Sequence, residues 1–278
     1  MRVAITQEAI YRYPAESNYS IQYLRLCPMT GPDQRVLSWR VAGPGSLRPW
    51  TDGFGNAAHV LVVEGPHNEV RVRAVGEVDI ADAGRPLPAD TDPHPPELFL
   101  RPTRLTEADD HILRFAGGFR PFLAANVRKG LDSLMTGIHD SVDGAAPPEP
   151  ETVTASQALR GRTGGSWTRA HLFLSCCRSL GVPARFVSGF VCREPRDRGG
   201  LSPHAWAEAW GSGAGWLRFD SSTPMSNTRA HVRVAVGLDY FDTAPIRGLR
   251  RGSGGGTIDM RMRLSDGTGG KAAHQAQQ

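Results

Sequence analysis

The 278-residue chain has no long apolar run, no block of basic residues and only four cysteines. No stretch approaches the roughly 20 apolar residues of a membrane-spanning helix, so the sequence does not predict a membrane protein. The first residues, Met1 to Glu8, lack the apolar core of a secretory signal peptide, and we therefore expect a cytoplasmic protein. Lysine and arginine are scattered along the chain, a distribution that does not predict nucleic-acid binding.

The cysteines show neither metal nor redox spacing. Cys176 and Cys177 follow Ser166 by ten or eleven residues on one predicted helix, so they lie about 15 Å away and we expect packed core thiols. His171 lacks a partner at i+4 and a third ligand, so we expect it in the core or behind the site. The sequence therefore predicts no metal and no organic cofactor.

Glycine and proline are abundant, at 32 and 21 residues, and they divide the chain into short segments. Residues 1–82 predict an antiparallel β domain whose strands alternate or are β-branched, and the run Asp52–Asn56 predicts a hairpin turn within it. A Pro- and Asp-rich connector at 83–104 follows, which should hold no packed element. The expected core spans 105–264, and the polar, Gly-rich tail at 265–278 is expected to be disordered. The five expected strands of the β domain cover residues 2–6, 20–26, 36–41, 59–64 and 69–75.

Helices are expected in the first half of the core. Thr106 with Asp109 resembles the cap and acid of a helix start, and Gly117-Gly118 would end that helix. A second helix is expected over 121–142 and a short one over 154–160. Residues 145–150 and 193–203 predict loops, the latter a rim over the cleft, and strands follow from Arg185 onward, so the fold class is α+β.

The most informative stretch runs from Gly164 to Pro183. Two glycines allow a sharp turn, Ser166 is a favourable residue at a helix start, and an apolar stripe at i, i+3, i+4 and i+7 follows it. A helix N-terminus offers free N–H groups and partial positive charge, which would stabilise negative charge developing on a nucleophile. We therefore expect Ser166 at the start of a buried helix, with its backbone N–H as an oxyanion donor.

Two later segments complete a possible triad. His204 shares one strand face with Trp206 and Glu208, while the alternating alanines face the other way. Asp220 ends the next strand, and a turn at 211–213 makes the two strands a hairpin, which can place the carboxylate beside the imidazole. A nucleophile, a histidine and an aspartate in this order are suited to base-assisted acyl transfer.

These segments resemble the transglutaminase-like core of the papain-like thiol enzymes. The run Leu180 to Gly189 closely matches the family pattern Leu-Gly-x-Pro-Ala-Arg-Tyr-Val-Ser-Gly, and His204-Ala205-Trp206 and Trp216 to Asp220 match two further blocks. Segments at 11–14, 24–28, 52–56, 234–240 and 245–248 are similar to other parts of the bacterial family. The resemblance implies a nucleophile helix packed on an antiparallel sheet, preceded by an N-terminal antiparallel β domain. It also implies acyl transfer, giving amide-bond formation or hydrolysis.

The family's nucleophilic cysteine falls on Ser166, and its Asp-Phe pair falls on Thr168-Arg169. Ser166 therefore has three interpretations: a working serine nucleophile, a centre inactivated naturally or by engineering, or a helix cap in a protein that only binds. In the first, Ser166, His204 and Asp220 are catalytic, and Trp167 and Trp206 contact substrate, although Trp167 could instead be packing. The resemblance implies a peptide, amide or carrier-bound thioester as substrate and an amine or water as acceptor. The alternative is an inactive binding or scaffold protein.

Overall fold

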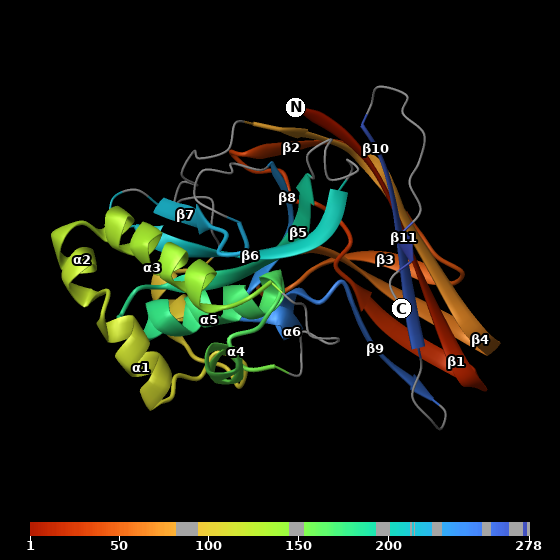
Figure 1. The fold of residues 1–278 in the computed structure, drawn as a ribbon. Coiled ribbons are helices and arrows are strands. Elements are labelled where there is room, and N and C mark those ends of the chain that lie inside the picture. The colour runs from red at the N-terminus through yellow and green to blue at the C-terminus, as the bar shows by residue number, and fades with distance from the viewer. Residues whose placement is uncertain are drawn as a thin grey trace.

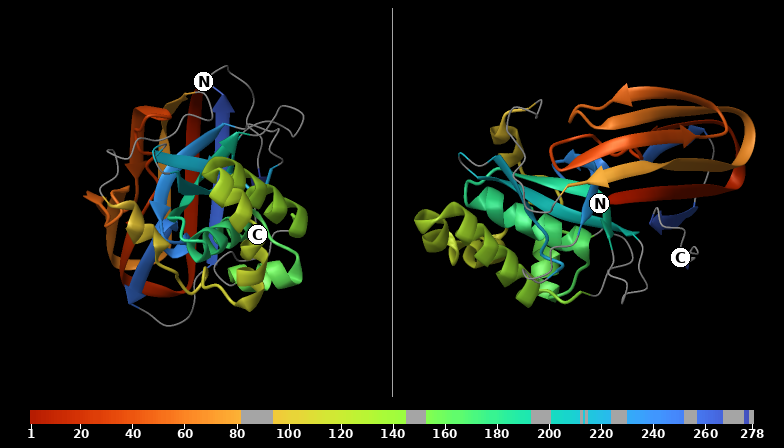
Figure 2. Two further views of the ribbon diagram at one scale, coloured as in Figure 1. Left: turned by 90° about the vertical axis from the view of Figure 1, so that its left-hand side faces the viewer. Right: turned by 90° about the horizontal axis from the view of Figure 1, so that it is seen from above.

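The computed structural model describes residues 1–81, 94–144, 153–192, 201–211, 213, 215–223, 230–251, 257–266 and 275–276. Two antiparallel sheets lie side by side, and most of the helices gather on the side of the second sheet away from the first (Figures 1 and 2). The predicted α+β class is confirmed. The strands are β1 (Arg2–Leu24), β2 (Gln34–Ala42), β3 (Ser46–Thr51), β4 (Ala57–Ile80), β5 (Ala184–Cys192), β6 (Leu201–Gly211), β7 (Gly215–Phe219), β8 (His231–Gly237), β9 (Ile246–Arg251), β10 (Thr257–Asp266) and β11 (Gln275–Ala276). The helices are α1 (Asp110–Gly117), α2 (Arg120–Ala125), α3 (Val127–Ser141), α4 (Ala155–Gly161), α5 (Ser166–Ser179), α6 (Tyr240–Thr243) and the 3-10 helix η2 (Pro96–Leu100).

Two long strands form the centre of the first sheet, where the sequence predicted four short ones. Strand β1 pairs with β4 from Arg2 opposite Asp79 to Leu24 opposite His59. The irregular parts of the two strands lie opposite each other, with register shifts between Arg12 and Tyr19. Gly65, with φ of 83°, lies in the matching part of β4. The expected breaks are therefore wrong, because both strands bend together at a bulge and keep pairing beyond it.

The end of the chain returns to this first sheet. Strand β9 pairs with the second half of β1, and β10 pairs with the first half. Residues 246–264, which the sequence assigned to the core, therefore extend the N-terminal sheet. Within the expected tail, β10 runs on to Asp266 and β11 pairs with β10. Pairing between strands some 240 residues apart leaves no local sequence signal.

The second sheet has the order β7-β6-β5-β8, and helix α5 covers one of its faces. The alanines of β6 that the alternation placed together lie in the same core cluster as Phe173 and Leu174 of α5, as predicted. Small side chains let the helix approach the strand closely, and that approach fixes the start of α5 relative to β6. No helix in the described part of the chain has the length and apolar character needed to cross a bilayer.

Several predicted helix boundaries are corrected by capping. Asp109, not Thr106, caps α1, because its carboxylate accepts from the backbone N–H groups of His111 and Ile112. The helix expected over 121–142 is divided at Asn126, whose side chain accepts from Lys129 N–H and starts α3. Thr154 forms a capping box at α4, in agreement with the short helix expected there.

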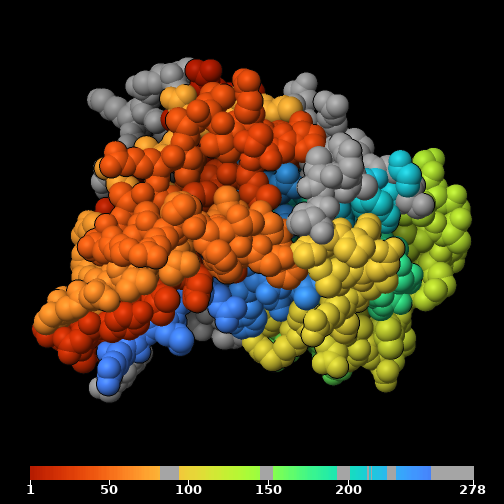
Figure 3. Space-filling view, turned by 180° about the vertical axis from the view of Figure 1, so that it is seen from behind, coloured from red at the N-terminus to blue at the C-terminus, as the bar shows by residue number. Residues whose placement is uncertain are grey.

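The connector contains a packed element, contrary to expectation. Its 3-10 helix η2 buries Phe99, which meets Trp216 edge to face at 5.2 Å between ring centroids. Residues 83–93 of the connector, the loop expected at 145–150 and residues 193–200 of the loop expected over 193–203 lie outside the described residues. The last three residues of that second loop, 201–203, instead begin strand β6. From behind, the space-filling view shows blue residues of the later chain between the orange N-terminal strands and the yellow segment that follows residue 94 (Figure 3).

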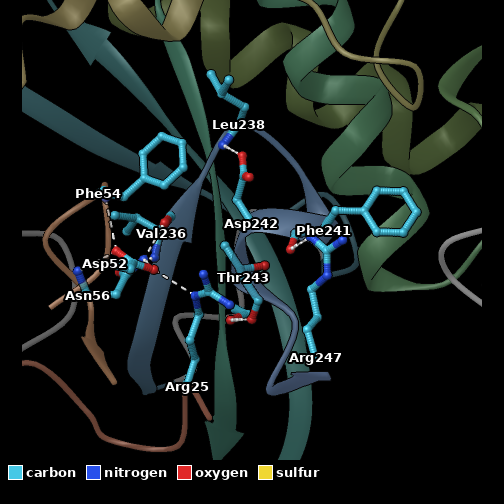
Figure 4. A network of polar contacts seen from close by, with 12 residues as sticks. Arg25, Asp52, Phe54, Asn56, Val236, Leu238, Phe241, Asp242, Thr243 and Arg247 are labelled. Atoms are coloured by element: carbon cyan, nitrogen blue, oxygen red, sulfur yellow. Dashed lines mark hydrogen bonds and ion pairs between the residues drawn. The ribbon is translucent and has the colours of Figure 1, made fainter. Parts of the chain in front are cut away.

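Side-chain amides of the first sheet cap the outer edge of β8. Asn56 accepts from Val236 N–H at 2.8 Å and donates to Val236 C=O at 2.7 Å (Figure 4). Gln34 makes the same pair of bonds with Arg233, at 2.7 Å each. Each amide therefore presents one donor and one acceptor to β8, as a neighbouring strand would. The turn Asp52–Asn56 connects β3 and β4 as predicted, and it also joins the two sheets.

We expect Asn56→Ala to lower the free energy of unfolding by about 2 to 4 kcal/mol, because it leaves the buried N–H and C=O of Val236 without partners. Urea unfolding of the full chain measures this loss. Asn68→Ala is the matched control, since Asn68 lies exposed on β4. Equal stability of the two variants would show that the edge of β8 does not need the Asn56 amide.

Candidate active site

Ser166 lies at the first position of α5, next to the strand that carries His204. The cap residue is Gly165, which has extended backbone angles and offers no side-chain cap, so the expected capping role of the Ser166 hydroxyl is wrong. Instead, Ser166 Oγ accepts from the backbone N–H of Ala205 at 3.4 Å. Gly164 is required by space, because a Cβ there would lie 2.9 Å from the side chain of Thr168. The hydroxyl therefore lies at the start of the helix and beside the backbone of β6 at Ala205, the residue that follows His204.

The carboxylate of Asp220 is the centre of the polar cluster behind Ser166. Its Oδ2 accepts from His204 Nε2 at 2.8 Å and from His231 Nε2 at 3.0 Å. Its Oδ1 accepts from the backbone N–H and the hydroxyl of Ser222, at 3.0 and 2.6 Å. The sequence predicted the contact between His204 and Asp220, but it did not predict His231 or Ser222. Among the described residues, His204 Nδ1 makes no hydrogen bond.

The loop that carries Asp220 is fixed from the helical side. Arg169, one turn after Ser166 on α5, donates to the carbonyl of Ser221 at 3.0 Å, and His139 of α3 lies 3.1 Å from the same oxygen. Arg169 also bonds the carbonyl of Val142 at the end of α3. Arg169, one of the two residues that depart from the family pattern, thus ties α5, α3 and the Asp220 loop together.

Trp206 does not line an open surface. Its indole is only 1% exposed, so a substrate could not reach it without displacing its neighbours, and the predicted substrate contact is corrected. The ring lies beneath the two imidazoles, with centroids 6.4 Å from His204 and 4.7 Å from His231. Gly189 lies close to the same indole, where an added Cβ would come within 3.1 Å of it. Trp206 therefore supports the orientation of both histidine rings.

Burial and the two imidazoles act in opposite directions on Asp220. Burial favours the neutral acid, but the charge and hydrogen bond of His204, with smaller contributions from His231, hold the pKa of Asp220 well below its usual value. Burial lowers the pKa of His231, although the hydrogen bond and the charge of Asp220 act to raise it. The arrangement therefore presents an ionised carboxylate that orients a base.

The other candidates lie where the sequence suggested. Cys176 and Cys177 are fully buried, and burial raises the pKa of both thiols, so they are inert core residues. His171 is buried against Phe186, and its Nε2 accepts from Tyr240 N–H at 3.1 Å. Trp167 is half-buried and packs on the core cluster around α5, which favours the packing interpretation, while a substrate contact by Trp167 stays a prediction.

Comparisons with known proteins agree with this architecture. Residues 3–79 match the model of the bacterial transglutaminase-like N-terminal region, and residues 124–221 match that of the transglutaminase-like superfamily. An uncharacterised protein of Mycobacterium leprae is 26% identical over 292 residues, covering 95% of this chain and 98% of that protein. One of Mycobacterium tuberculosis is 25% identical over 295 residues, covering 89% of this chain and 87% of its own. Both similarities extend over the two sheets.

A crystal structure of a candidate cysteine protease from Cytophaga hutchinsonii has the same fold, with a TM-score of 0.66 at 17% identity, covering 95% of this chain and 90% of that one. The two matched regions lie in the order that the sequence resemblance implied. The chain belongs to the transglutaminase-like superfamily and joins its papain-like core to the N-terminal region of the bacterial proteins.

His171 gives a prediction for the pH dependence of stability. Burial, with a smaller effect of Arg178, lowers its pKa to about 3 from an ordinary value of about 6.5. Between those values the unfolded chain binds a proton that the folded chain excludes, so stability falls as pH falls, by about 1.4 kcal/mol per unit. We expect His171→Asn, which cannot titrate but can still accept from Tyr240, to remove this part of the slope. Urea unfolding between pH 4.5 and 7 tests it, and an unchanged slope would contradict a neutral His171.

Proposed function

We propose that this protein catalyses acyl transfer at an amide or thioester carbonyl, with Ser166 as nucleophile, His204 as base and Asp220 as the group that orients His204. The observation that carries the proposal is the buried 2.8 Å bond between His204 and Asp220, adjacent to a serine at a helix N-terminus. Membership of the superfamily supports acyl-transfer or peptidase-like chemistry in general. The triad, with serine as its nucleophile, is the part that we propose beyond the family.

The bond between Asp220 and His204 Nε2 supports one direction of proton transfer in this mechanism. Because Asp220 holds Nε2 of His204, the proton of the Ser166 hydroxyl passes to Nδ1 as Oγ bonds to the carbonyl carbon. A base is required, because a serine hydroxyl ionises far less readily than the thiol of the related enzymes. The first-turn N–H of Ser166, which has no helical acceptor, is aligned with the helix dipole to stabilise the oxyanion.

The cycle then follows from the same groups. His204 returns the proton to the departing amine or thiol as the C–N or C–S bond breaks, leaving an ester on Ser166. An amine or water attacks that ester, its proton passes through His204 to Ser166 Oγ, and the acyl group leaves as an amide or an acid. We propose a peptide, amide or carrier-bound thioester as acyl donor.

The rival function is that of an inactive homologue that binds without catalysis. The absence of a capping bond from Ser166 within α5 removes one structural reason to retain a serine there. The ionised Asp220 with its ring of donors supports the enzyme, since a histidine base needs an ionised carboxylate to hold its ring and to stabilise its protonated form. We therefore place acyl transfer first.

Turnover of an activated ester, p-nitrophenyl acetate, tests the proposal. We expect the native protein to release p-nitrophenol and to carry an acetyl adduct on Ser166 in intact-mass spectra, whereas Ser166→Ala does neither. Asp220→Asn should lower turnover by roughly a hundredfold or more, because it loses the charge that stabilises protonated His204. Ser179→Ala, at the other end of α5, is the matched control and should keep full activity.

Equal inertness of the native and Ser166→Ala proteins, with turnover gained in Ser166→Cys, would identify a thiol centre that has lost its nucleophile. That outcome would contradict the serine mechanism and favour the inactive homologue. Circular dichroism of each variant confirms that loss of activity does not come from loss of fold.

A further inference from the structure

Asp220 holds a second imidazole that the proposed triad does not need. A triad uses one imidazole on the carboxylate, whereas here His231 shares Oδ2 with His204. One nitrogen from each histidine and one oxygen of Asp220 all lie within 4.8 Å of one another. The three side chains are 5 to 10% exposed, so their donors are held in place by the surrounding protein. His231 begins β8, which the first sheet fixes at Arg233 and Val236.

The chemistry of these donors fits a transition-metal ion of the zinc class. Two imidazole nitrogens with one carboxylate oxygen are a common set of protein ligands for such ions. Tetrahedral zinc, with bonds near 2.1 Å, would separate its ligand atoms by about 3.4 Å. The observed 2.8 and 3.0 Å to Oδ2 would need to widen by about half an ångström, and the two nitrogens already lie within 4.8 Å of each other. Ser222 Oγ also lies beside the set, 3.2 Å from His204 Nε2.

The atoms around the set also resemble the outer shell of a metal site. Ser222 donates twice to Oδ1 and so fixes the plane of the carboxylate while Oδ2 faces the imidazoles. The indole of Trp206 packs against the imidazole rings of His204 and His231. Two positively charged side chains would repel a metal ion here. Arg169 interacts with Asp220 through its charge, and Arg218 interacts with His231 in the same way. Arg218 is paired with Asp33 at 2.8 Å, which offsets part of its effect.

We propose that His204, Asp220 and His231 bind one divalent ion of the zinc class, and that the bound ion switches off the acyl-transfer site. The binding itself does not depend on the proposed function, but the inhibition does. An ion on Nε2 of His204 takes the lone pair of that nitrogen, so the ring proton must lie on Nδ1. A protonated Nδ1 cannot accept the proton of Ser166, and Asp220 is no longer available to orient the ring. The ion is thus a regulator of the site and takes no part in the reaction.

Isothermal titration of the full chain with zinc chloride tests the site. We expect one ion per chain in the native protein and equally in Ser166→Ala, because Ser166 is not a ligand. Asp220→Asn and His231→Gln should each weaken binding by roughly a hundredfold or more, since each removes one of three ligands. His59→Gln is the control, because His59 lies 3.6 Å from the Cys27 thiol and forms another place where zinc could bind.

Nitrogen-15 NMR of the native protein identifies the ligands without any substitution. We expect the Nε2 signals of His204 and His231 to shift together as one equivalent of zinc is added, which keeps the test decisive if a variant fails to fold. Absence of binding in the native protein, or its loss in His59→Gln but not in His231→Gln, would overturn the proposal.

Ester turnover separates this inference from the proposed function. We expect zinc to inhibit the native enzyme at the concentrations at which it binds, and a chelator to restore the rate. Zinc binding to a native protein that has no turnover would refute the catalytic proposal and leave the metal site standing. Tight binding with unchanged turnover would overturn the inhibitory half of the inference.

Discussion

The close packing of α5 on the alanine face of β6 is the contact on which the rest of the site depends. Ala205, Ala207 and Ala209 present little more than their Cβ atoms, so the helix lies near enough for Ser166 to meet the backbone of Ala205. Larger side chains on this face would move the helix N-terminus away from Ala205, and so away from the strand that carries His204. A displacement of about 1 Å between reacting groups can cost roughly a hundredfold in rate. The small residues therefore set how closely Ser166 approaches the strand that carries His204.

A single buried carboxylate organises the other side of the site. Asp220 accepts four hydrogen bonds, from His204, His231 and twice from Ser222. The charge of His204 and the hydrogen bonds of the two imidazoles keep the carboxylate ionised despite its burial. Arg169 and His139 hold the carbonyl of Ser221, so the loop position does not rely on Asp220 alone. Because both imidazoles share Asp220 Oδ2, this carboxylate suits both the proposed triad and the proposed metal site.

The first sheet supports the site through β8. Gln34 and Asn56 supply the hydrogen bonds that the outer edge of β8 needs, at Arg233 and Val236. Arg233 lies two residues after His231 on the same strand, so the hydrogen bonds of Gln34 also hold the part of β8 that carries His231. Ion pairs join the sheets as well, since Asp33 accepts from Arg218 at 2.8 Å. The N-terminal sheet is therefore part of the structural support of the candidate site, and it is completed in turn by β9 and β10 from the end of the chain.

Local patterns in the sequence were enough to predict the α+β class, the helix after Gly165, the hairpin of β6 and β7 and the pairing of His204 with Asp220, because periodicity, turn residues and spaced motifs act over short distances. It could not reveal His231, which lies 11 residues after Asp220 in no recognisable spacing, or the return of β9 and β10. It also placed Trp206 in contact with substrate, since alternation gives the face of a strand but not what covers that face. These features came from the folded chain, because they rest on contacts between distant segments whose energies depend on packing and burial.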